Sequence, residues 1–326
     1  MHFGRIENIE EIDLILPPDD KITEKLWQQL EPAASEPLRI YVGCTEWGRK
    51  NWVGKVYPRG TKDKDFLAHY VKQFNTIELN ALFYNLQPKH VIERWSSLAD
   101  TGFRFCPKFS DSISHKQQLI NAGRDTDLFI GHMQHFEEHL GPCFLQLSES
   151  FGPNRAGVLQ NYLRNLPRDF RTCVELRQES WFGGGAARPA AGVGAVAGPA
   201  TGDPSSAVQE TWELLRELGV GTVITDTPGR RDVLHMRLTA PVAFIRYVGN
   251  NLHPTDYQRI DAWVDRIKSW VDKGLREIYF FTHNPEELNS PEMCCYVVEQ
   301  FNKKCGTALK PPRLMEKPPE NLSLFD

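Results

Sequence analysis

Ionisable and amide side chains follow a series of short apolar segments, each at the point where the segment ends. Glu78, Lys108, Gln146, Glu175 and Arg246 are placed in this way. Arginine and lysine bind the oxygens of phosphates and carboxylates, and a glutamate or lysine whose pKa is shifted by burial can transfer protons. Burying so many polar groups costs free energy unless they satisfy one another. The pattern therefore indicates either an anion-handling active site or a hydrogen-bonded polar plug.

The chemistry that we favour is catalysis, of a hydrolase, lyase or isomerase type, on an anionic small molecule such as a phosphorylated one. Glu175 or Glu78 is the expected general base, and His115 or Lys108 the expected acid. Arg246 is the expected clamp for the anion. The residues expected to bind substrate are Trp47, Asn80, Tyr84, Gln146, Arg177, Trp181, Asp226, Arg246 and Asn284.

Two other chemistries use some of the same residues. A glycosidase needs two carboxyl groups about 5–10 Å apart, and we expect Glu78 and Glu175 to lie too far apart for this role. A divalent metal needs Asp, Glu and His ligands that cluster together. Glu175, Asp226, His115 and His283 are the available ligands. We predict no cofactor, and a metal site is the less favoured alternative.

In the alternative without catalysis, the charged residues only neutralise one another. Arg177 would then pair with Glu175, and Arg246 with Asp226. The chain would be a binding or scaffold protein in which these groups close the end of the fold.

These side chains must be positioned by elements that alternate along the chain. Short β-rich apolar segments are separated by stretches with helical periodicity. The predicted strands are 40–47, 74–80, 102–109, 143–148, 171–177, 221–226, 242–249 and 277–284. The predicted helices between and after them are 64–73, 89–99, 127–140, 156–166, 206–218, 255–273 and 291–304. Such alternation predicts right-handed crossovers and a parallel sheet, and eight units match an α/β fold of the (β/α)8 TIM-barrel type. The motif GxGxxG is missing after the first strand, which disfavours an open nucleotide-binding sheet.

The composition is that of one globular domain with additions. The chain has 326 residues, of which 40% are hydrophobic and 25% charged. We expect an N-terminal extension at 1–38 with one helix near 22–30, the barrel at 39–309, and a proline-rich tail at 310–326. Residues 183–204 are rich in glycine, alanine and proline, and we expect them to form a disordered insertion after the fifth strand.

Charge and hydropathy exclude some settings. A net charge of −4 argues against a protein that coats nucleic acid by bulk charge, although a local basic groove stays open as an alternative. The sequence has no long apolar run and no signal-like start, which predicts a cytoplasmic protein without a membrane partner. Seven cysteines in such a chain do not predict a disulfide framework.

Several sequence blocks resemble one family in order along residues 38–305. They are 43–47 (Gly-Cys-Thr-Glu-Trp), 52–54 (Trp-Val-Gly), 74–80 (Phe-Asn-Thr-Ile-Glu-Leu-Asn), 174–177 (Val-Glu-Leu-Arg), 180–182 (Ser-Trp-Phe) and 244–246 (Phe-Ile-Arg). The chain thereby resembles the domain of unknown function 72 family, also called YecE-like. The resemblance implies a TIM barrel of the kind found in sugar isomerases and an apurinic endonuclease, and it implies no reaction. Gln178 and Val248 stand where that family often has histidine.

The C-terminal tail predicts a second class of function. Residues 321–325 (Asn-Leu-Ser-Leu-Phe) resemble the motif by which bacterial DNA-repair proteins dock on the sliding clamp, usually Gln-Leu-x-Leu-Phe. Leu322, Leu324 and Phe325 would be the anchors in an apolar groove. The alternative function is therefore a DNA-repair-associated, nucleic-acid-binding protein tethered to the clamp.

Overall fold

Strands and helices alternate along the chain, and a computed structural model describes residues 9–30, 36–183 and 204–315. The strands are β1 (Arg39–Gly43), β2 (Thr76–Leu79), β3 (Arg104–Pro107), β4 (Cys143–Gln146), β5 (Thr172–Glu175), β6 (Gly221–Asp226), β7 (Ala243–Val248) and β8 (Glu277–His283). The α-helices are α1 (Lys21–Trp27), α2 (Phe66–Tyr70), α3 (Ala81–Tyr84), α4 (Lys89–Ser97), α5 (Gly123–Met133), α6 (Ala156–Arg164), α7 (Pro204–Glu217), α8 (Pro254–Asp272) and α9 (Ser290–Cys305). Each predicted strand is present, and most are shorter than predicted.

The strands form two parallel sheets. One has six strands in the order β1-β8-β7-β6-β5-β4, and the other pairs β2 with β3. All the strand pairings in the described residues are parallel, as the βα alternation predicted. The α/β class is therefore confirmed, whereas these eight strands do not form one continuous hydrogen-bonded ring.

Hydrogen bonds join the two sheets at both edges. Between β1 and β2, the Asn75 side-chain amide donates to the Ile40 carbonyl at 2.9 Å and accepts from the Val42 backbone amide at 2.8 Å, beside one backbone hydrogen bond from Glu78 to Cys44 at 3.1 Å. Between β3 and β4, the Phe109 amide donates to the Phe144 carbonyl at 3.0 Å. The seams are thus bridged by a few contacts and not by full ladders.

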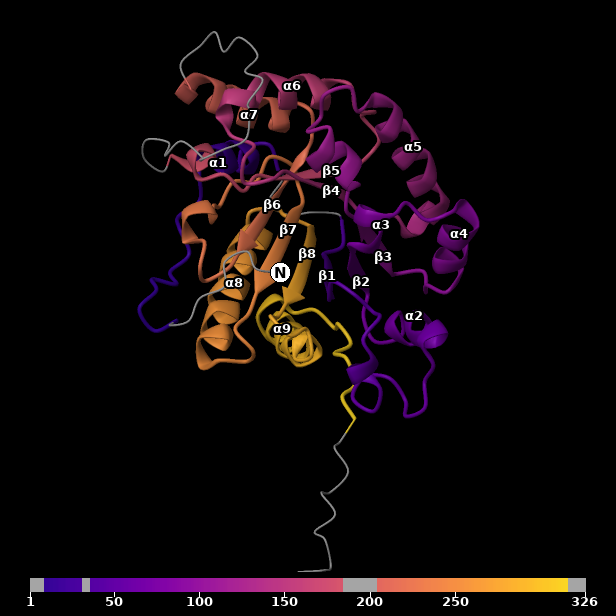
Figure 1. Cartoon of the computed structure of the whole chain (residues 1–326). Helices are drawn as coiled ribbons and strands as arrows, with labels where there is room; N and C mark the ends of the chain where they lie inside the picture. The colour runs from indigo at the N-terminus through magenta and orange to yellow at the C-terminus, as the bar shows by residue number, and fades with distance from the viewer. Residues whose placement is uncertain (1–8, 31–35, 184–203, 316–326) are drawn as a thin grey trace, which may run out of the picture.

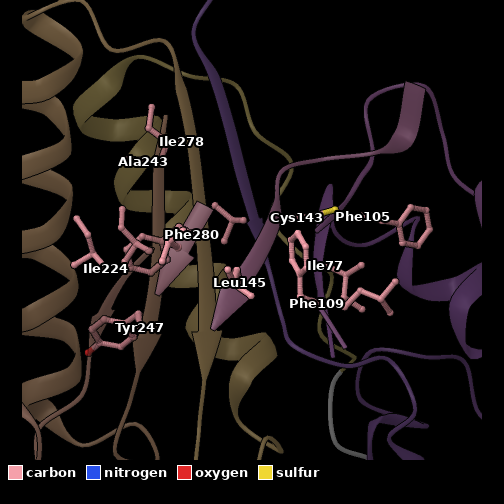
Figure 2. Close-up of a cluster of buried hydrophobic side chains, with 14 of the residues drawn as sticks. Ile77, Phe105, Phe109, Cys143, Leu145, Ile224, Ala243, Tyr247, Ile278 and Phe280 are labelled. Atoms are coloured by element: carbon pink, nitrogen blue, oxygen red, sulfur yellow. The ribbon is translucent and has the colours of Figure 1, made fainter. Parts of the chain in front are cut away.

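Buried side chains form two layers on opposite faces of the strands. An inner apolar layer draws members from both sheets: Tyr41, Cys106, Phe144, Cys173, Val223, Ala240, Val242, Phe244, Tyr279 and Phe281. Alternate residues such as Ile77, Leu145 and Ile224 lie in a larger cluster, which Figure 2 shows with members from β2 to β4 and from β6 to β8. Side chains alternate along a strand, so the residue two positions beyond an inner-layer residue points to the same face of the strand.

The helices cover the outer faces of the strands. In Figure 1, α8 lies on one side of the labelled strands, and α2, α4 and α5 lie on the other. Helix α8 begins at Pro254, which suits the first helical position, and it buries Ile260, Trp263, Ile267 and Trp270 at helical spacing. Helix α1 corresponds to the helix predicted near 22–30. In the described part of the chain, every helix is too short or too polar to cross a membrane.

Replacing Gly43 tests the closeness of β1 and β2. A Cβ at Gly43 would lie 2.1 Å from the backbone oxygen of Thr76. We expect Gly43→Ala to lower the free energy of unfolding, measured by urea titration. The loss should be about 1–3 kcal/mol or more, since this is the range typical of overpacking. The matched control is Gly48→Ala, since a Cβ there meets nothing within 4 Å. Equal stability of the two variants would contradict this packing of β1 against β2.

Candidate functional site

A polar layer lies directly beyond the inner apolar layer, at the carboxyl ends of the strands. Several of its members each follow an inner-layer residue by two positions: Lys108, Gln146, Glu175, Thr225, Arg246 and His283. Residues i and i+2 of a strand face the same way, so these side chains turn to one side. Glu78 of β2 joins them through its hydrogen bonds. This position is where parallel α/β folds collect reactive groups.

Arg246 is the centre of the polar layer. Its Nε and Nη2 donate to the two carboxylate oxygens of Glu78 at 2.7 and 2.8 Å. Its Nη1 donates to both oxygens of Glu175 at 3.1 and 2.9 Å. The side chains of all three residues are at most 1% exposed. Because the guanidinium already binds two carboxylates, the predicted anion clamp is not available to a ligand, and Arg246 does not neutralise Asp226.

Glu175 accepts further hydrogen bonds from three directions. Gln146 donates at 2.8 Å, Arg177 at 2.7 Å and Thr225 at 3.0 Å. The predicted pairing of Arg177 with Glu175 is therefore present. A carboxylate with this many donors is strongly held in its ionised form.

The two carboxylates are ionised at neutral pH. Burial alone would raise the pKa of Glu78, but Arg246 and His283 hold it well below its usual range. Burial likewise opposes ionisation of Glu175, and Arg177 and Arg246 overcome it to lower the pKa to about 2. Since both carboxylates bind one guanidinium, the expectation that β2 and β5 hold them far apart is wrong. Such acidic groups are nevertheless poor proton donors or bases near pH 7.

Lys108 is the basic group with unusual protonation. Its Nζ donates to Gln146 Oε1 at 2.8 Å and lies 3.9 Å from the centre of the Phe83 ring. Burial and then the positive charge of Arg246 lower the pKa of Lys108 to about 7. The pKa of an ordinary lysine is about 10.4, so this amine loses its proton at a much lower pH, in the physiological range. Within the described residues, no carboxylate forms an ion pair with it.

His115 also packs against the Phe83 ring. The two rings meet edge to face at 5.0 Å, and His115 Nδ1 is 2.9 Å from the Ser114 hydroxyl. His115 belongs to a π-helix, Ser112–Lys116, a rare element that is frequent at functional sites. Burial, Lys108 and Arg177 lower its pKa. Lys108, His115 and Arg177 therefore act on one another electrostatically at this end of the strands.

Of the remaining residues predicted to bind substrate, three lie at or near this end of the strands in different settings. Asn80 joins the polar layer by donating to Glu78 Oε1 at 2.8 Å. Tyr84 lies beside Phe83 and is 79% exposed. Trp47 packs edge to face on Trp95 of α4, with ring centres 5.1 Å apart, which gives it a packing contact instead of a contact with the polar layer.

Three predicted residues lie apart from the polar layer. Asp226 follows Thr225 on β6, so it turns to the opposite face and binds Arg259 at 2.8 Å and Trp263 at 2.7 Å. Trp181 is fully buried and donates to the Phe151 carbonyl at 2.8 Å. Asn284 is buried and accepts from the Asn251 amide at 3.2 Å. Their contacts are structural.

Two residues of the site, Thr225 and Glu287, were not among the predicted ones, and a third, His283, was considered only as an available metal ligand. Thr225 binds Glu175, and His283 Nε2 lies 3.1 Å from Glu78 Oε2. Glu287, 3.7 Å from the other nitrogen of His283, has its pKa raised by burial. Strand alternation was the available signal for Thr225, but it requires knowing which face of β6 is enclosed. Glu287 lies after β8 and carried no signal.

The described residues of this end of the strands hold no metal cluster, and the pocket identified in the structure lies elsewhere. Over residues 9–30, 36–183 and 204–315, no three His, Cys, Asp or Glu side chains are arranged to hold a metal ion. A pocket of about 360 Å³ lies at the opposite, amino ends of the strands, where Arg171 and Glu277 line it. The charged chemistry and this pocket are therefore separate features.

The predicted insertion and most of the tail fall outside the described residues. This applies to residues 184–203 and to the anchors Leu322, Leu324 and Phe325. Docking on a sliding clamp stays a prediction.

Known proteins share both the sequence pattern and the fold. The profile of a family described as "Protein of unknown function DUF72" matches residues 41–193 and 203–318. The UPF0759 protein YecE of Escherichia coli K12 is 25% identical over 304 residues, which cover 88% of this chain and all of that protein. The UPF0759 protein YunF of Bacillus subtilis 168 is 25% identical over 150 residues, covering 44% of this chain and 52% of that protein.

Two crystal structures have a similar fold. A DUF72 family protein from Enterococcus faecalis V583 superposes with a TM-score of 0.59 at 18% identity, covering 86% of this chain and 99% of that one. A DUF72 family protein from Thermotoga maritima MSB8 superposes with a TM-score of 0.58 at 22% identity, covering 82% and 99%. At this identity the likeness concerns the fold alone.

Removing Arg246 tests its role as a structural ion. We expect Arg246→Met to lower the free energy of unfolding by about 3–5 kcal/mol, because Glu78 and Glu175 would stay buried without their cation. Lys268→Met is the control, since it breaks an exposed pair with Asp272 whose contribution is about 0.5 kcal/mol. Urea unfolding of both variants measures the difference. A loss no larger than the control would contradict the central role of Arg246.

Lys108 should make stability depend on pH with an unusual sign. The folded protein releases this proton near pH 7, whereas an unfolded lysine keeps it to about pH 10.4. Between these values the unfolded state binds more protons, so the free energy of unfolding rises with pH, by about 1.4 kcal/mol for each unit of lowered pKa. We expect the difference between the native protein and Lys108→Met to show this rise in urea titrations. A flat difference over that range would mean that Lys108 keeps its proton.

Proposed function

The chain belongs to the DUF72 family. From the polar layer at the carboxyl ends of its strands, we propose that the protein is an enzyme that acts on a small anionic molecule, such as a phosphorylated one. The observation that carries the proposal is Lys108. A nearly buried amine with a pKa of about 7, held by a neutral amide, is a costly arrangement that suits proton transfer or nucleophilic attack.

The balance of charge favours an anion. Three basic side chains, Lys108, Arg177 and Arg246, share the polar layer with two carboxylates, Glu78 and Glu175. With Lys108 protonated, this group carries a surplus positive charge. An anionic group placed beside Lys108 and Arg177 would offset that surplus, and arginine suits carboxylate and phosphate oxygens.

The residues take different roles from those first predicted. Lys108 is the acid or base at the reacting atoms, and His115, which contacts the same Phe83 ring, is the second titratable group. Arg177 replaces Arg246 as the group that faces the anion. Glu78 and Glu175 hold Arg246 in place, since carboxylates with such low pKa values transfer protons poorly near pH 7.

We also infer that the eight strands enclose a (β/α)8 barrel. The seams at β1–β2 and β3–β4 are bridged by hydrogen bonds, and the inner apolar layer contains residues of both sheets. In such barrels the active site lies at the carboxyl ends of the strands. The place of Lys108 supports this location for the reaction.

The proposal is tested by a thermal-shift panel of sugar phosphates, sugars, nucleotides, abasic DNA and divalent metals. We expect phosphorylated compounds to stabilise the protein, by about 2.7 kcal/mol at one hundred times the dissociation constant. The shift should be lost in Lys108→Gln and reduced in His115→Gln. Lys116→Gln is the matched control, because Lys116 is exposed on the same π-helix and pairs with Asp111.

A panel without any shift would contradict the proposal. A shift that persists in Lys108→Gln but disappears in Lys116→Gln would place the ligand outside the polar layer and would overturn the role of Lys108.

A further inference from the structure

We propose that Lys108 Nζ forms an imine with the carbonyl carbon of its substrate, so that the substrate is a small anionic aldehyde or ketone. The inference rests on the proposed function and names the substrate class of the same site. It is carried by the way in which the polar layer holds the amine.

The orientation of Gln146 fixes the amine without giving it a charge partner. Gln146 Nε2 donates to Glu175, and a carboxylate can only accept. The other end of the amide, Oε1, must therefore face Lys108, from which it accepts at 2.8 Å. A neutral acceptor takes one N–H of the amine and leaves its lone pair available.

The ionised neighbours are committed elsewhere. Arg246 binds Glu78 and Glu175 together, and Arg177 binds Glu175. Both nearby carboxylates are thus bound to guanidinium groups, and in the described residues neither forms an ion pair with the amine. The titratable or charged groups that act on Lys108 are Arg246, Glu175, Arg177, Glu78 and, from the π-helix, His115. Burial, Arg246 and Arg177 lower the pKa of Lys108 to about 7 against the opposing effect of Glu175 and Glu78, so the unprotonated amine is populated near pH 7.

The surroundings select the carbonyl compound. Lys108 and Arg177 both act electrostatically on His115, so positive charge gathers at this end of the strands and favours an anionic substituent on the substrate. The Phe83 ring, 3.9 Å from Nζ, limits the space on one side of the amine. A short carbonyl compound that carries a carboxylate or phosphate fits these features.

The reaction balances without a redox partner. The lone pair of Nζ attacks the carbonyl carbon, a C–N bond forms, and the oxygen becomes a hydroxyl by taking a proton. Loss of the N–H proton and of that hydroxyl as water then gives the imine. Its protonated form withdraws electrons from the adjacent C–C or C–H bond, which is the chemistry of a lyase or an isomerase.

Reductive trapping tests the inference on the full-length protein. Glyoxylate, glycolaldehyde phosphate or neutral propionaldehyde is added with sodium cyanoborohydride, which reduces an imine to a stable amine, and peptide mass spectrometry locates the adducts. At pH 7 we expect Lys108 to react about tenfold or more faster than exposed Lys116, because an ordinary lysine there is almost wholly protonated. Lys108 should also prefer the two anionic aldehydes over propionaldehyde by a larger factor than Lys116 does.

The outcomes separate this inference from the proposed function. Lys108 that reacts no faster than Lys116 overturns the imine, while phosphate-dependent thermal shifts would still support an anion-handling enzyme. Preference for glyoxylate alone, or for glycolaldehyde phosphate alone, supports the imine and identifies the anionic group. Equal preference for all three aldehydes overturns the anionic substrate class.

Discussion

The structure depends on one buried ion, Arg246, held between two carboxylates from different sheets. Glu78 comes from the two-stranded sheet and Glu175 from the six-stranded sheet, so the guanidinium joins what the backbone leaves divided. Each partner alone would be an uncompensated charge in an apolar setting, and the inner layer lies directly beneath, with Phe144 under the guanidinium. The group is stable only when all three members are present.

This constraint decides which residues remain for chemistry. The carboxylates that attract attention as acids and bases are occupied by Arg246 and Arg177, which keep them ionised. Their fixed charges surround Lys108, whose own partner is a neutral amide. Burial and the neighbouring Arg246 lower the pKa of this amine to about 7, a shift of the kind that is common at functional sites. Within the polar layer, the residues that hold the structure together are therefore different from the residue proposed for the chemistry.

The sequence allowed the elements to be predicted better than the contacts. Hydrophobic periodicity located all eight strands, and strand ends located Glu78, Lys108, Gln146, Glu175 and Arg246. The face of each side chain was less certain: Asp226 ends β6 but turns to α8, and its neighbour Thr225 takes the inner place. The pairing of Arg177 with Glu175 was predicted, but the partners of Arg246 were not, because they depend on distances across the fold that strand order alone does not give. The same holds for the Asn75 amide, which bridges two strands that local patterns treat alike.

The sparse pairing between β3 and β4 has a consequence for local opening of the structure. Lys108 follows β3 on one side of the seam and Gln146 belongs to β4 on the other, so their hydrogen bond crosses it. Backbone pairing there is sparse, and sparse pairing means a low free energy of local opening. Loss of the hydrogen bond between Lys108 and Gln146 therefore also removes one of the contacts that join β3 to β4. Loss of this hydrogen bond and local opening of the seam between β3 and β4 are therefore coupled, and amide exchange in these two strands reports on both.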